Sequence, residues 1–195
     1  MSVPKLDGNT ELIIVQYMLR DLEEYVKSDV LYWHVAEPNP LGSHMPQLTL
    51  GGLLEATTRA EVAQNDLTAS QRQELSTAQA QHDRIRAAHP ARYVSKAIHE
   101  LHSRLDAWKA DLDDSGRKTR WVYAQDVHVR AKIHLLEQAL GADVSAELKQ
   151  QREQLDLELY EVFVPGEFVW DARLQAVFPK NPCWWLYGHL LEEHV

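Results

Sequence analysis

The sequence predicts an all-α fold, an antiparallel bundle of four or more helices with a polar peripheral helical hairpin or arm and a short C-terminal helical extension. Apolar residues recur at three- and four-residue spacing over most of the chain, which is the period of one helix face. No segment shows the two-residue alternation of a half-buried strand. Because 195 residues can bury a sizeable core, we expect a single domain over 1–195.

The segment 121–140 carries two apolar stripes and is expected to be the central helix. One stripe consists of Val122, Val129, Ile133, Leu136 and Leu140, and the other of Trp121, Ala124, Val127, Ala131 and Leu135. A helix that is wetted on one side needs only one stripe. We therefore expect neighbouring helices on both flanks of a helix over 117–140.

The N-terminal third of the chain predicts one core helix and an irregular connection. A turn at 7–10 supplies an N-cap, and an apolar arc then predicts a helix over 10–34. The segment 37–47 contains three prolines and a glycine, so it must be irregular. We interpret it as a crossover connection.

The segment 51–88 holds few large aliphatic side chains and predicts two peripheral helices. Thr68 and Gln71 have the spacing of a capping box, which separates a helix over 51–65 from one over 69–88. With little apolar surface to bury, these helices form either a projecting hairpin or a solvated outer layer of the bundle.

The remaining helices are delimited by proline and glycine. Pro90 begins a helix over 91–112, and a short turn at 113–116 makes this helix an antiparallel neighbour of the central one. A core helix over 144–164 follows Gly141. Beyond the Pro-Gly pair at 165–166 we expect two C-terminal helices, and the sequence places them at 169–177 and 182–193.

The composition of the chain excludes or disfavours several functional classes. The net charge of −9 opposes non-specific binding to nucleic acid and to anionic membranes. Cys183 is the single cysteine, so an intramolecular disulfide and a Cys-rich zinc site are excluded. The N-terminus lacks the pattern of a secretory signal, and no apolar run approaches the roughly 18 residues of a membrane span. We expect a cytoplasmic protein.

Four residues could form a metal site. His99, His102 and Asp106 lie on one side of the predicted 91–112 helix, and His128 belongs to the neighbouring central helix. Against this, the chain has no Glu followed by His three residues later, the pair that di-iron bundles require. The alternative is that His99 and His102 are solvated and that His128 is a hydrogen-bonded core imidazole.

Nucleophilic catalysis has little support, and we assign no catalytic residue. Cys183 would need a histidine beside it, but His189 lies about 120° away on the predicted helix. No phosphate-binding glycine loop or hydrolase motif is present. We expect Cys183 to be a buried structural thiol.

The C-terminal segment carries the clearest interaction signal. On the predicted 182–193 helix Trp184 lies at the edge of the inward face, whereas Trp185 falls with His189 on the polar face. Trp is the residue most enriched at binding hot spots. We therefore assign Trp184, Trp185 and His189 to partner binding; the alternative is that the segment 168–170 covers Trp185.

The sequence thus favours a non-catalytic acidic helical interaction protein or a subunit of a larger cytoplasmic complex. Its partner would be another protein or a second copy of the chain, bound through the C-terminal helix. The second possibility is a metal-dependent or small-molecule-binding helical-bundle enzyme that uses the His cluster, although no cofactor is favoured. The third is a subunit of a nucleic-acid-associated complex, which is disfavoured because the basic residues gather in two separate places.

Overall fold

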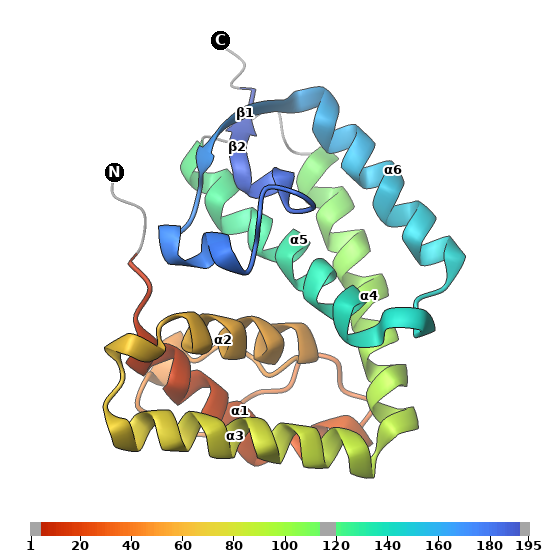
Figure 1. Cartoon of the computed structure of the whole chain (residues 1–195). Coiled ribbons are helices and arrows are strands. Elements are labelled where there is room, and N and C mark those ends of the chain that lie inside the picture. Colours follow the sequence, from red (N-terminus) through yellow and green to blue (C-terminus); the bar gives the residue numbers. More distant parts are fainter. Residues whose placement is uncertain (1–4, 114–119, 192–195) are drawn as a thin grey trace. The chain divides into compact units, whose positions relative to one another are not determined.

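The computed structural model describes residues 5–113 and 120–191 and confirms the helical fold class. Its α-helices are α1 (Gly8–Lys27), α2 (Leu50–Val62), α3 (Ala69–Ala88), α4 (Pro90–Asp113), α5 (Arg120–Leu140) and α6 (Ala146–Val162) (Figure 1). A small sheet contains β1 (Phe163–Phe168) and β2 (Tyr187–Leu190). The predicted turn at 113–116 and the start of the 117–140 helix fall largely outside the described residues.

The chain divides into two compact units, of which one is Leu6–Glu100 and the other contains the residues from Leu101 onward. In the first unit α1 packs against both α2 and α3. A buried apolar cluster joins the three helices and the turn after α2, and it consists of Leu12, Ala60, Leu67 and Leu75. The segment expected to be a polar peripheral hairpin therefore supplies two helices of this unit, which also contains α1 and the beginning of α4.

Small residues help to explain how α2 packs on α1 with few large aliphatic side chains. A Cβ atom at Gly8 of α1 would lie 2.8 Å from the backbone oxygen of Ala63, directly after α2. Ala60 is fully buried between the same elements. When two backbones approach this closely, small side chains are enough to exclude water between them. A count of large aliphatic residues therefore underestimates how well such helices pack.

Capping interactions explain where two of the helices begin or end. Thr68 and Gln71 form the predicted capping box at the start of α3. By contrast, the helix predicted over 10–34 is shorter, since α1 ends at Lys27. The Lys96 amine donates to the backbone oxygens of Ser28 and Val30, at 2.6 Å and 2.9 Å, so a cation from α4 satisfies carbonyls that follow the helix.

The second unit is built on α5, whose neighbours lie on several sides. Residues of both predicted stripes are buried, among them Val127, Ala131, Ile133 and Leu136. Val122 is 38% exposed, so the first stripe does not extend to the beginning of the helix. The side chain of Trp121 lies outside the described residues.

The C-terminal segment is mainly not helical, and the prediction of a helix over 182–193 is wrong. A short 3-10 turn, η6 (Trp184–Leu186), leads into β2, which pairs antiparallel with β1. The expected 169–177 helix is likewise a 3-10 turn, η5 (Ala172–Ala176). A continuous helix would leave Trp185 on its polar face, whereas the turn and strand bury Trp185, Leu186 and Leu190 together.

The β1–β2 pairing depends on a glycine at one close approach. Gly188 pairs with Pro165, and a Cβ atom at position 188 would lie 2.2 Å from the backbone oxygen of Val164. Since this neighbour is backbone, it cannot move aside as a flexible side chain can. Only glycine fits there.

We predict that Gly188→Ala lowers the free energy of unfolding by about 2 kcal/mol, because the added methyl group forces the two strands apart. Chemical denaturation followed by circular dichroism measures this change. The matched control is Gly166→Ala in β1, where the nearest atom would be 3.6 Å from the new Cβ. Equal stabilities for the two variants would contradict the proposed strand geometry.

Candidate functional site: a groove between helix α6 and Trp184

Helix α6 exposes two large apolar side chains one turn apart. Leu157 is 63% exposed and Tyr160 is 69% exposed, the highest fractions among the large hydrophobic side chains that the structure describes. Both lie opposite the buried residues of α6, which are Leu148, Leu155 and Leu159. The fold therefore does not use these two side chains for its own core.

The two residues border a groove of about 440 Å³. Its lining consists of Arg152, Glu153, Asp156, Leu157, Tyr160 and Trp184. Five of the six residues come from α6, and Trp184 is supplied by η6. The groove thus combines an apolar strip with a charged end.

Aromatic contacts fix the position of Trp184. Its ring meets Tyr160 edge to face at a centroid distance of 5.6 Å and meets Phe163 in the same way at 5.2 Å. Phe163 in turn contacts Tyr123 of α5 at 6.0 Å. Edge-to-face pairs stabilise aromatic clusters beyond simple burial, so the apolar side of the groove is held in place before any ligand arrives.

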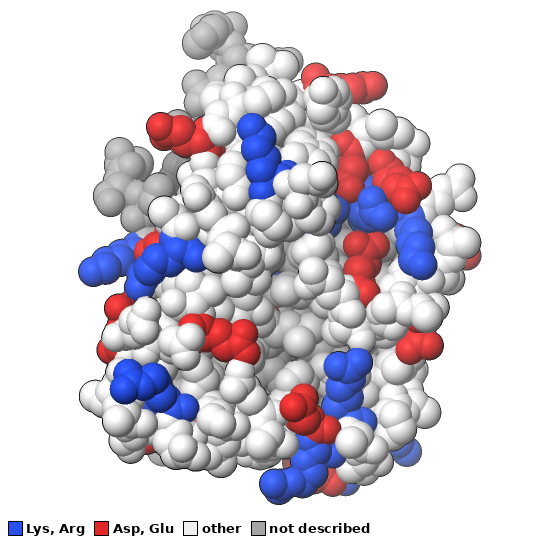
Figure 2. Space-filling model, in the orientation of Figure 1, with Lys and Arg blue, Asp and Glu red and all other residues white. Residues whose placement is uncertain are grey.

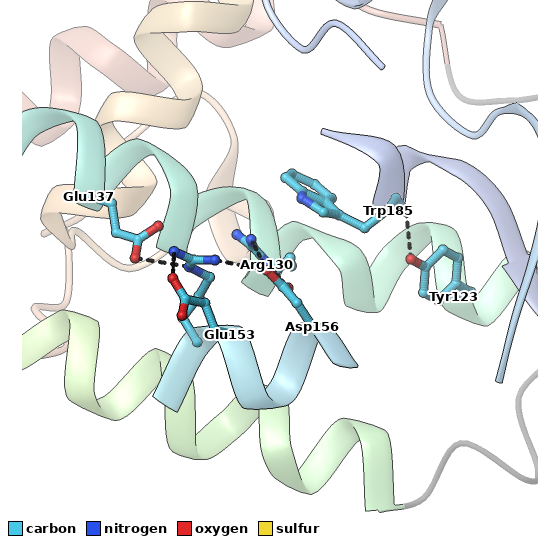
Figure 3. A network of polar contacts seen from close by, with 7 residues as sticks. Tyr123, Arg130, Glu137, Glu153, Asp156 and Trp185 are labelled. Carbon is cyan, nitrogen blue, oxygen red and sulfur yellow. Dashed lines mark hydrogen bonds and ion pairs between the residues drawn. The ribbon is translucent and has the colours of Figure 1, made fainter. Parts of the chain in front are cut away.

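A buried arginine lies beneath the charged end of the groove. Arg130 of α5 is 4% exposed and makes a bidentate ion pair with Asp156, with nitrogen to oxygen distances of 2.8 Å and 2.9 Å (Figure 3). The guanidinium also lies over the ring of Trp185, 4.9 Å from its centroid. Asp156 is therefore held by the interior of the protein although it borders the groove.

Arg152 completes this network at the surface. It contacts Glu137, Glu153 and Asp156, each at 3.3 Å. Burial alone would lower the pKa of Arg152, but the carboxylates of Glu137 and Asp156 outweigh burial and raise it. The positive charge of Arg152 is thus permanent and is neutralised within the chain.

The surface around the groove is acidic. Helix α6 contains five acidic and two basic residues, a net charge of −3. On the face seen in Figure 2, acidic side chains are interspersed with basic ones over the region of α6. Glu153 and Glu161 stand four residues before and after Leu157, and both are exposed.

The residues assigned to partner binding have three different environments. Trp184 lines the groove, as described above. Trp185 is 1% exposed, and its backbone oxygen accepts a hydrogen bond from Tyr123 (Figure 3). The interpretation of Trp185 as an indole on an exposed polar face is therefore wrong. His189 is half-buried on β2 opposite Val164 and does not line the groove.

The proposed metal ligands are not brought together. His99, His102 and Asp106 are exposed on α4, whereas His128 of α5 stacks on Trp170 at a centroid distance of 4.3 Å. Within residues 5–113 and 120–191, no group of three His, Cys, Asp or Glu side chains is arranged to hold a metal ion. The geometry gives the metal hypothesis no support.

Cys183 has a histidine beside it that the sequence analysis did not consider. His134 of α5 lies with Nε2 3.6 Å from the Cys183 sulfur. Burial raises the pKa of Cys183 to about 11 and lowers the pKa of His134 to about 4, the latter with help from Arg130 and Arg152. Both groups are neutral near pH 7, so they do not form the thiolate and imidazolium pair of a nucleophilic site.

A second pocket, of about 320 Å³, lies at the end of α1 and contains several cations. Arg92 donates to the backbone oxygen of Lys27 at 2.8 Å, and Lys96 is occupied by the carbonyls described above. These cations have a structural role, because they terminate a helix at its negative end. We therefore place the candidate site at α6.

No protein-family model matches the chain, and neither curated proteins nor solved structures include one that is significantly similar to it. Among the described residues, no helix is both long and apolar enough to cross a membrane.

We predict that Asp156→Asn lowers the free energy of unfolding by ~3 kcal/mol, because it leaves the buried Arg130 charge without its counter-ion. The control is Arg152→Gln, which removes a partly exposed cation and should cost ~1 kcal/mol or less. Urea denaturation at neutral pH measures both values. If the two variants were equally stable, Arg130 would not depend on Asp156.

A second prediction concerns pH. Since the pKa of His134 is about 4 in the folded protein and 6.5 ordinarily, only the unfolded chain takes up this proton between these values. The contribution of neutral His134 to the free energy of unfolding is present above pH 6.5 and is lost as the pH falls toward 4. Stability should therefore decline less steeply over this range in His134→Gln than in the unmodified protein.

Proposed function

We propose that the chain is a non-catalytic helical interaction protein that binds a segment of another protein in the groove between α6 and Trp184. The observation that carries this proposal is the pair Leu157 and Tyr160, two large apolar side chains left exposed beside an ordered indole. Burying such side chains contributes about 1.5–3 kcal/mol each. A partner that covers them gains this free energy.

The composition of the groove supports a protein ligand. Protein interfaces commonly have an aromatic-rich apolar centre and a polar rim, and Trp and Tyr are enriched at their hot spots. Tyr160 and Trp184 supply such a centre, while Glu153, Asp156 and Arg152 supply the rim.

The other functional classes have less support. An acidic helix repels nucleic acid, whose binding depends on neutralising phosphate charges. The His cluster of the enzyme alternative is not assembled among the described residues. The Cys183 and His134 pair is neutral and only Cys183 is fully buried, which opposes a nucleophilic role.

Site-specific photo-crosslinking tests the proposal. We expect a photoreactive phenylalanine analogue in place of Leu157 to capture a discrete partner in cells of the source organism. The same analogue in place of Val177, which is 39% exposed on the same unit, should not capture that partner. Adding Tyr160→Ser to the Leu157 variant should abolish the adduct.

Two results would contradict the proposal. One is the absence of any adduct at position 157. The other is an adduct that forms equally at positions 157 and 177 or that persists in the Tyr160→Ser background, because either would mean that capture does not depend on the groove. Circular dichroism of each variant ensures that the fold is retained.

A further inference from the structure

We propose that the partner segment is a basic amphipathic helix, with apolar anchors spaced by three or four residues and Lys or Arg at its flanks. This inference rests on the proposed function of the groove and adds the chemistry and conformation of its ligand.

The apolar strip has the residue spacing of a helix-binding site. Leu157 and Tyr160 are three residues apart, so they follow one another along the axis of α6 with a rise of about 4.5 Å. Trp184 extends this strip beside α6, because its ring contacts the ring of Tyr160 edge to face at a centroid distance of 5.6 Å. Helix-in-groove binding uses apolar anchors at the same three- or four-residue spacing, so a second helix can lay its apolar face along this strip.

The acidic residues of α6 favour a positively charged partner. Glu153 and Glu161 lie on the same helix face as Leu157, one turn before it and one turn after it. A docked helix with Lys or Arg one turn outside its anchors would place a cation near each carboxylate. Such complementarity increases association rates and excludes partners of the wrong sign.

The arginines near the groove do not oppose a cationic ligand. Arg130 and Arg152 are paired with three carboxylates, those of Asp156, Glu137 and Glu153. This cluster therefore has a net charge of −1 at neutral pH, and Glu158 and Glu161 of α6 add further negative charge. The groove as a whole attracts cations.

A second copy of the chain is a poor occupant for the same reason. A two-fold symmetric contact through the groove would place one α6 against another, and each carries a net charge of −3. The whole chain has a net charge of −9, which adds to the repulsion. The favoured occupant is another protein of opposite charge.

Synthetic peptides of about 18 residues test this inference. One peptide combines a Leu and Trp stripe at helical spacing with Lys and Arg elsewhere, a second keeps the stripe but has Glu in place of the cations, and a third scrambles the basic sequence. Fluorescence anisotropy of labelled peptides measures their affinity for the full chain. We expect the basic amphipathic peptide to bind at least tenfold more tightly than either of the others.

Variants of the protein separate groove binding from general attraction to an acidic chain. Tyr160→Ser should weaken binding of the basic peptide at least tenfold, and Glu153→Lys with Glu161→Lys should reverse the preference between basic and acidic peptides. Val177→Ser should have no effect. Raising the ionic strength from about 0.05 M to about 0.5 M should weaken binding several-fold.

The inference is overturned if the acidic peptide binds as tightly as the basic one, if the scrambled peptide binds equally well, or if Tyr160→Ser has no effect on peptide binding. These failures are distinct from failure of the proposed function. A crosslinked partner at position 157 that carries an acidic or non-helical binding segment would retain the groove as an interface while refuting this description of its ligand.

Discussion

Arg130 is a permanent charge in an apolar interior, and the second unit of the protein is arranged to accommodate it. Removing a guanidinium from water is costly unless a counter-ion with suitable geometry replaces the lost hydration. Asp156 of α6 accepts two charge-assisted hydrogen bonds from Arg130, and the face of Trp185 covers the guanidinium. The requirement to pair Arg130 therefore fixes how α6 and η6 lie against α5.

The groove follows from this arrangement. Because Asp156 pairs with Arg130 below and with Arg152 beside it, the charged end of the groove cannot shift along α5 without breaking a buried ion pair. Trp184 is the neighbour in sequence of Trp185, which is itself fixed by Tyr123. A groove whose two sides are both anchored in the core loses little conformational entropy when it binds a ligand.

The sequence predicted the elements with local signals and missed those that depend on distant contacts. The capping box of Thr68 and Gln71 and the proline at position 90 are local, and the two helices that begin there, α3 and α4, were predicted to within one residue. The strand β2 depends on pairing with β1, and the burial of Trp185 depends on Tyr123, 62 residues away. No helical wheel contains that information.

The same distinction applies to the candidate site. Trp184 was identified, although for its place on a helix that does not form. Leu157 and Tyr160 were missed even though a wheel of the 144–164 helix contains the signal, since both fall on its polar face. The exposed apolar side chains lie within an acidic helix, and this combination has a physical consequence. Like charges discourage two chains from associating through these side chains, so an apolar surface can remain open to a partner of opposite charge.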